Sequence, residues 1–93
     1  MQQKRAVITV VGKDTVGIIA RVCTYLAEHG INILDISQTI VQGFFNMMMI
    51  VDITDLEIPF GDVADELAEL GSGQLGVQIK CQKEEIFDLM HRI

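Results

Sequence analysis

The chain has 93 residues, of which 49% are hydrophobic and 22% charged, with a single proline. This composition argues against disorder and favours one compact domain. Seven Lys and Arg against thirteen Asp and Glu give a net charge of −6, so we expect neither nucleic acid nor an acidic membrane surface as a partner. No apolar run approaches the roughly 20 residues that cross a bilayer, and the N-terminus lacks a signal-peptide pattern. We therefore expect a cytoplasmic protein.

The first two elements are distinguished by their hydrophobic spacing. Residues 5–11 (RAVITVV) are rich in β-branched residues and predict a strand buried on both faces, hence central in its sheet. From Val16 the apolar residues recur every three or four positions, which predicts a helix that ends at His29 and Gly30. The predicted stripe along this helix consists of Val16, Ile19, Ala20, Cys23, Leu26 and Ala27.

The middle of the chain reads as a hairpin followed by a second helix. Residues 32–41 and 44–53 are strand-like and are separated by Gln42 and Gly43, which suit a tight turn, so we expect antiparallel pairing. Pro59 opens a helix that Gly71 ends. Its apolar stripe is Phe60, Val63, Ala64, Leu67 and Leu70.

The last third of the sequence predicts a flexible connection, an edge strand and a C-terminal helical tail. The sequence GSGQLG (71–76) is typical of a flexible connection, and 75–81 alternates apolar with polar or small residues, as a strand with one covered face does. Residues 83–93 carry apolar positions at helical spacing and predict a short amphipathic helix.

This order of elements predicts an α+β fold, the ferredoxin-like βαββαβ sandwich. A four-stranded antiparallel sheet carries two helices on one face, and a short C-terminal helix follows. We expect one domain over 1–93, with a core over about 4–82 and a helical tail over 83–93.

The second hairpin strand is apolar on both sides. Its three consecutive methionines are interpreted as core residues, with a methionine-lined ligand surface as the alternative. An apolar outer side implies that the helix-free face of the sheet is covered by the tail helix or by another subunit, and we expect a homo-oligomer.

The motif VGKDTVGIIA (11–20) places a glycine where a helix begins. Asp14 is predicted to be the N-cap, which makes Gly17 the third helical residue and leaves the first turn bare enough for a small carboxylate to approach. The alternative is that Gly17 allows close packing of the helix on a strand. The motif lacks the G-K-[ST] ending of a phosphate loop.

Metal and cofactor chemistry is not suggested by the sequence. Cys23 and Cys81 are too few and too far apart for a disulfide framework or a zinc site, and His29 and His91 lie at predicted helix ends. We expect no metal, no cofactor and no catalytic residues.

The segments VGKDTVGIIA, LAEHG and INILDISQ together resemble the ACT domain family, most closely its stand-alone single-domain members. The resemblance covers about residues 4–82 and implies a βαββαβ ligand-sensing module. In that family the ligand, commonly an amino acid, lies between the loop and first helix of one domain and the second strand of a neighbouring domain. Carried onto matching positions, the resemblance implies ligand-binding residues Gly12, Lys13, Asp14, Gly17 and Asn32, with Asp35 and Ser37 as secondary candidates.

These features predict a non-enzymatic regulatory module that binds a small amino acid or similar metabolite at a homo-oligomer interface. Two alternatives stay open, namely a pure protein–protein assembly module without a ligand and an acylphosphatase-like hydrolase. The hydrolase would need an arginine on its phosphate loop, where this chain offers only Lys13.

Overall fold

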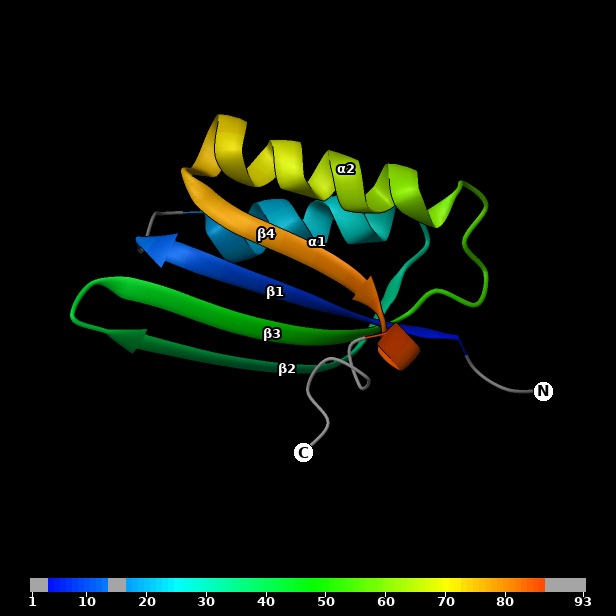
Figure 1. Cartoon of the computed structure of the whole chain (residues 1–93), viewed down its shortest axis with the longest axis horizontal. Coiled ribbons are helices and arrows are strands. Elements are labelled where there is room, and N and C mark those ends of the chain that lie inside the picture. The colour runs from blue at the N-terminus through cyan, green and yellow to red at the C-terminus, as the bar shows by residue number, and fades with distance from the viewer. Residues whose placement is uncertain (1–3, 14–16, 87–93) are drawn as a thin grey trace.

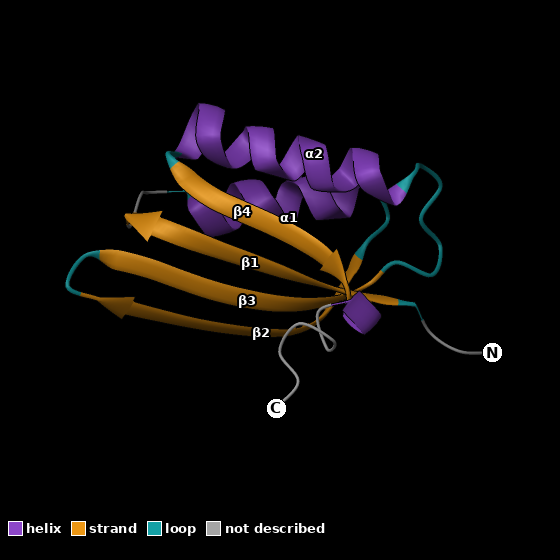
Figure 2. Ribbon diagram, viewed as in Figure 1, coloured by secondary structure: helices purple, strands orange, loops and turns teal. Residues whose placement is uncertain are grey.

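The computed structural model of the chain describes residues 4–13 and 17–86 and has one four-stranded antiparallel sheet with both main helices on one side. Figure 1 shows α1 and α2 stacked over the sheet, and Figure 2 shows the two layers by type of element. The elements are β1 (Arg5–Lys13), α1 (Ile18–Glu28), β2 (Asn32–Val41), β3 (Phe44–Asp52), α2 (Phe60–Leu70), a π-helical turn (Gly71–Leu75) and β4 (Val77–Lys83). The predicted ferredoxin-like fold is confirmed.

The strand order is β2-β3-β1-β4, and all neighbours are antiparallel. β1 is therefore central and β4 lies at an edge, as the sequence predicts. The hairpin turn is also confirmed, because Gln42 and Gly43 have φ values of 51° and 83°, the left-handed pair that matches the twist of the flanking strands.

The core lies between the sheet and the two helices. β1 contributes Ala6, Ile8 and Val10, and β3 contributes alternate residues from Phe45 to Val51. Met47 and Met49 are buried and Met48 is exposed, so two of the three consecutive methionines are core residues, as interpreted from the sequence.

The helix-free face of the sheet also carries exposed apolar residues, among them Phe44 and Met48. The expectation that this face is covered stays a prediction. Residues 84–86 begin the expected C-terminal helix, and its remainder lies outside the described residues.

The segment expected to be a flexible link is instead ordered as the π-helical turn, and that prediction is wrong. Gly71 continues the right-handed helical backbone of α2, and Gly76, with a φ of 68°, ends the turn. Gly71 is buried beneath β4, where a Cβ atom would lie 2.7 Å from the carbonyl oxygen of Val77. Glycine is present because the backbone passes too close to β4 for any side chain. As a result β4 begins at Val77 rather than Leu75.

Candidate functional site

The start of α1 differs from its prediction. Gly17 has φ 90° and ψ 3° and is the N-cap residue, α1 begins at Ile18, and the amide of Arg21 donates to the Gly17 carbonyl at 2.9 Å. The prediction that Gly17 is the third residue of this helix is therefore wrong, and the prediction that Asp14 caps the helix lies outside the described residues. The physical reason is the left-handed backbone of Gly17, which cannot lie inside a right-handed helix and which side chains disfavour.

The helix start is open at Gly17. Within the part of the chain that the structure describes, no atom outside its immediate neighbours lies within 4 Å of the position where a Cβ would stand, so the alternative of close packing on a strand is wrong. Among the described residues no side chain makes a capping hydrogen bond at the start of α1, and the first turn of the helix holds no acidic residue. The positive end of the α1 dipole is therefore not neutralised by an acidic residue in its own first turn.

The buried face of α1 also differs from the predicted stripe. Ile18, Val22 and Leu26 are buried, whereas Ala20 and Ala27 of the predicted stripe are exposed. The prediction for those two alanines is wrong, and Val16 lies outside the described residues.

Gly12 and Lys13 end β1, close in sequence to the start of α1. Gly12 also has a packing role, because a Cβ there would lie 2.8 Å from Cγ1 of Val77. Lys13 pairs with Phe44, the first residue of β3. These two candidates thus lie at the hairpin end of the sheet.

Asn32 lies at the other end of the sheet. It is the first residue of β2 and pairs with Asp52, which pairs with Arg5 at the start of β1. Arg5 and Lys13 are separated by eight steps of about 3.3 Å along β1, or about 26 Å. One chain therefore does not bring Asn32 together with Gly12, Lys13 and Gly17.

Asp35 and Ser37 lie on the helix-free face, where they pair with Ile50 and Met48. A bulge at Leu34, between Ile33 and Asp35, sets this arrangement. An oxygen of the Asp35 carboxylate accepts from the Ile36 amide at 2.9 Å. Within one chain these two side chains are on the opposite side of the sheet from α1.

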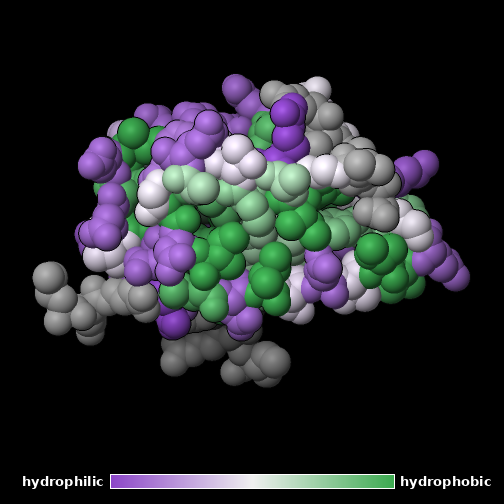
Figure 3. Space-filling view, turned by 180° about the vertical axis from the view of Figure 1, so that it is seen from behind, coloured by the Kyte–Doolittle hydropathy of each residue, from purple (hydrophilic) through white to green (hydrophobic). Residues whose placement is uncertain are grey.

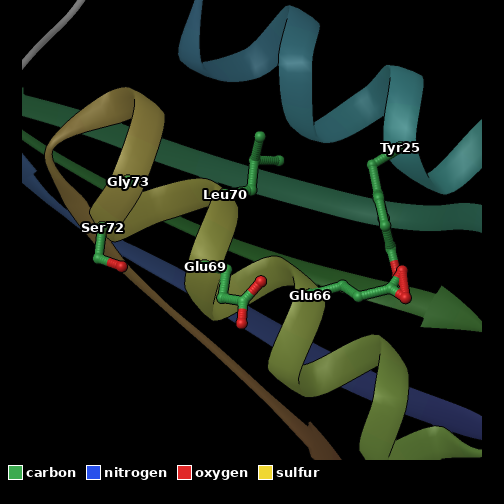
Figure 4. A pocket seen from close by; sticks show the side chains of 6 residues that line it. All are labelled: Tyr25, Glu66, Glu69, Leu70, Ser72 and Gly73. Carbon is green, nitrogen blue, oxygen red and sulfur yellow. The ribbon is translucent and has the colours of Figure 1, made fainter.

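A shallow pocket of about 540 Å³ lies between the two helices (Figure 4). It is lined by Tyr25, Glu66, Glu69, Leu70, Ser72 and Gly73. The Tyr25 hydroxyl on α1 donates to Oε1 of Glu66 on α2 at 2.8 Å, and the His29 ring stacks on Tyr25 with centroids 4.2 Å apart. This link between the helices was missed from the sequence because Tyr25 and Glu66 are 41 residues apart.

The pKa of Tyr25 is raised well above its ordinary value of 10.0, first by burial and then by the hydrogen bond to Glu66 and the charge of that carboxylate. The raised folded-state pKa favours the neutral phenol, so its stabilising effect is complete below pH 10.0 and is lost as the pH rises toward the folded-state value. The tyrosine is therefore a hydrogen-bond donor at neutral pH.

Replacing Glu66 by glutamine is expected to lower the Tyr25 pKa, but not to its ordinary value because burial remains. The chain has one tyrosine and no tryptophan, so the ultraviolet absorbance of the phenolate reports this residue alone. Glu69→Gln, in the same pocket, is the matched control and should leave the titration nearly unchanged. An unaltered titration curve in Glu66→Gln would contradict the hydrogen bond.

Burial raises the pKa of the Cys81 thiol to about 12, so this thiol stays protonated at neutral pH. Among residues 4–13 and 17–86, no group of three or more His, Cys, Asp or Glu side chains is arranged to hold a metal ion. In the same ranges, no helix has the length and apolar character needed to span a membrane.

Comparison with known proteins gives consistent matches over the whole fold. A family model described as the ACT domain matches residues 4–82. A UPF0237 protein of Bifidobacterium longum is 62% identical over 89 residues, which cover 96% of this chain and 98% of that protein. The structure of an ACT domain protein from Streptococcus pneumoniae superposes with a TM-score of 0.80 at 41% identity, covering 94% of this chain and 97% of that one.

A more distant structure is that of a proposed glycine cleavage system transcriptional repressor. It has a TM-score of 0.73 and 25% identity, and the match covers 89% of this chain and 47% of that one.

Proposed function

The chain belongs to the ACT domain family, and from this membership we propose that residues 1–93 form one non-enzymatic regulatory module that binds a small amino acid or a similar metabolite between two copies of the chain. ACT domains are regulatory, ligand-binding modules.

The observation that carries the proposal is the separation of the candidate residues. Gly12, Lys13 and Gly17 belong to the hairpin end of one chain, and Asn32 lies about 26 Å away along the sheet. The family resemblance requires both groups at one ligand. A second chain running antiparallel beside the first would supply its own Asn32 at the end where the first chain holds Gly12 and Lys13.

The chemistry of these groups suits a zwitterion. The start of α1 offers unpaired amides and a positive dipole end to a carboxylate, and the absent side chain at Gly17 leaves the approach open. The side-chain oxygen of Asn32 from the second copy can accept from the ligand's ammonium group. We retain the Asp14 carboxylate, which lies outside the described residues, as a second acceptor.

Regulation as the output is supported by family membership and by the resemblance to a proposed transcriptional repressor. A ligand that contacts two copies binds the assembled state better than the separated one, so it shifts the population toward assembly. A further protein would respond to that change in the fraction of assembled chains.

The test is the thermal unfolding of the native chain with each of the twenty amino acids at millimolar concentration. We expect at least one to raise the midpoint, because a ligand at a hundred times its Kd stabilises the folded state by about 2.7 kcal/mol. For a domain of this size that corresponds to a rise of roughly 10 °C or more.

Asn32→Ala should fold and bind that amino acid about tenfold or more weakly, since a hydrogen bond to a charged group contributes about 1.5–3 kcal/mol. Gln78→Ala, an exposed amide on the opposite edge strand, is the matched control and should bind as the native chain does. If none of the twenty raises the midpoint, the sensing proposal fails and the assembly module is favoured. Undiminished binding by Asn32→Ala would remove that residue from the site.

A further inference from the structure

The helix-free face of the sheet is buried at one end and open toward the other. Val7 and Val11 both lie on this face of β1, because they alternate with the core residues of that strand. Val7 is 4% exposed, whereas Val11, nearer the hairpin end, is 47% exposed. Both main helices lie on the opposite side of the sheet (Figure 1), so neither of them contributes to the burial of Val7.

The chain reaches the buried end of this face as it leaves β4. The last residue of β4 pairs with Ala6, one residue from Val7. Residues 84–86 then form a short helical turn, which Figure 1 shows beside the end of β4. Nη2 of Arg5 lies 2.6 Å from Oε2 of Glu84, and Arg5 is on the same face as Val7 because one residue separates them. This ion pair holds the start of the helical segment at the helix-free face.

The sequence that follows β4 predicts a helix with one apolar side. Within residues 84–93, apolar side chains recur every three or four positions, as in an amphipathic helix. They are Ile86, Leu89, Met90 and Ile93. Acidic residues stand at the start of the segment and basic residues toward its end, the arrangement that the helix dipole favours. Ile86 is 47% exposed, so the stripe begins with a side chain that is still largely in solvent.

From these observations we propose that residues 84–93 form a tail helix that lies along β1 and β3 on the helix-free face, with its apolar stripe packed against Val7 and Met48. Residues 87–93 lie outside the described residues. Two covers are expected for this face, the tail helix and another subunit. The tail helix is the one that the ion pair at Arg5 starts there.

The length of the tail helix fits the open part of the face. Residues 84–93 would rise about 15 Å as a helix, and the four strand steps from Val7 to Val11 span about 13 Å. Met48 pairs with Thr9, midway along this stretch, and is 41% exposed. A helix that starts beside Val7 therefore passes over Met48 and reaches the level of Val11.

The hairpin end of the face lies beyond the reach of this helix. Phe44 pairs with Lys13, two residues past Val11 on β1, and is 57% exposed. Phe44 and Met48 are thus exposed apolar residues on the same face of the same strand. Only Met48 lies where the tail helix would cover it, so Phe44 serves as the comparison for Met48.

A second apolar surface is an alternative place for the tail helix. Ile36 and Ile40 of β2 are 43% and 56% exposed and lie on the helix side of the sheet, opposite buried residues of β3. Figure 3, which views the molecule from behind, shows hydrophobic atoms gathered in a band. However, β2 is separated from β4 by two strands, and Glu84 is held on the other face by Arg5. The chain after β4 therefore starts on the helix-free face.

The test is the reaction of a cysteine at position 48 with an aromatic disulfide reagent, measured in the full chain. Cys23 is replaced by alanine, and the Cys81 thiol reacts slowly because burial raises its pKa to about 12 and keeps it protonated. Met48→Cys should react about tenfold or more slowly than Phe44→Cys, since thiol reactivity depends on exposure. The described residues alone leave both native side chains exposed.

Met90→Asp tests the apolar stripe directly. A carboxylate on that side should detach the tail helix, because burying an unpaired charge is costly, and the reaction of Met48→Cys should then be about tenfold faster. His91→Asp is the matched control, because it places the same side chain one residue later, on the polar side of the predicted helix. It should leave the rate unchanged, and Phe44→Cys should react equally fast with each of these tails.

Equal rates for Met48→Cys and Phe44→Cys beside the native tail would overturn the proposal, and so would a Met48→Cys rate that Met90→Asp leaves unaltered. Protection of Met48→Cys that increases with protein concentration would assign the face to a second copy and overturn it as well. The comparison with Phe44→Cys needs no substitution in the tail, so it decides the matter even if Met90→Asp does not fold.

Discussion

Replacing Met49 by alanine lowers the free energy of unfolding by about 2–5 kcal/mol, a large share of the stability of a domain this small. Met49 is fully buried in the middle of β3 and belongs to the cluster between the sheet and the helices. The lost transfer energy and the remaining cavity both contribute, because the close-packed surroundings relax only in part. Chemical denaturation at one fixed protein concentration measures the loss.

Met49→Leu is the control, because it keeps the side-chain volume and should cost less than about 1.5 kcal/mol. If both variants were equally destabilised, the position would depend on methionine chemistry rather than on filled volume. If alanine were tolerated without loss, the side chain would not be part of a packed core.

Gly71→Ala is expected to destabilise the chain by about 1–3 kcal/mol through overpacking. The new Cβ would lie 2.7 Å from the Val77 carbonyl oxygen and 2.8 Å from Cγ1 of Ile79. One of these contacts is with backbone, so β4 or the π-helical turn has to move. Valine at the same position should be worse, since its branched Cβ adds two further methyl groups.

Gly73, two residues later, provides the matched control. Among the described residues, no atom beyond its chain neighbours lies within 4 Å of its Cβ position, and its φ is not in the left-handed region, so Gly73→Ala should be neutral or stabilising by up to about 1 kcal/mol. Thermal unfolding of the two variants side by side tests the contrast. Equal effects at both positions would show that the cost comes from the helical turn itself and not from contact with β4.

The elements that could be predicted from the sequence are those set by local pattern. The hairpin at Gln42 and Gly43 follows from turn chemistry, and the buried side of β3 follows from simple alternation. The second helix follows from its proline start and glycine end. In each case the residues that decide the structure lie within a few positions of one another.

The predictions that were wrong depend on backbone angles and on contacts between segments distant in the sequence. The sign of φ at Gly17 is not encoded in its spacing from Asp14, and it moves the helix start by three residues. The ordered turn at Gly71 depends on β4 passing within contact distance. The separation of Asn32 from Gly12, by contrast, follows from the predicted topology, because β1 and β2 run parallel and the end of one lies at the opposite end of the sheet from the start of the other.

The bulge at Leu34 adds one residue to β2 that has no opposite residue on β3. The pairs on either side of it keep their partners on β3, so Asn32 and Ile33 are held separately from the stretch between Asp35 and Val41. A one-residue insertion or deletion at this point can therefore be absorbed locally without shifting Ile36 and Ile40. Evolution could in this way reposition Asn32 while the pairing of Ile36 and Ile40 with β3 stays unchanged.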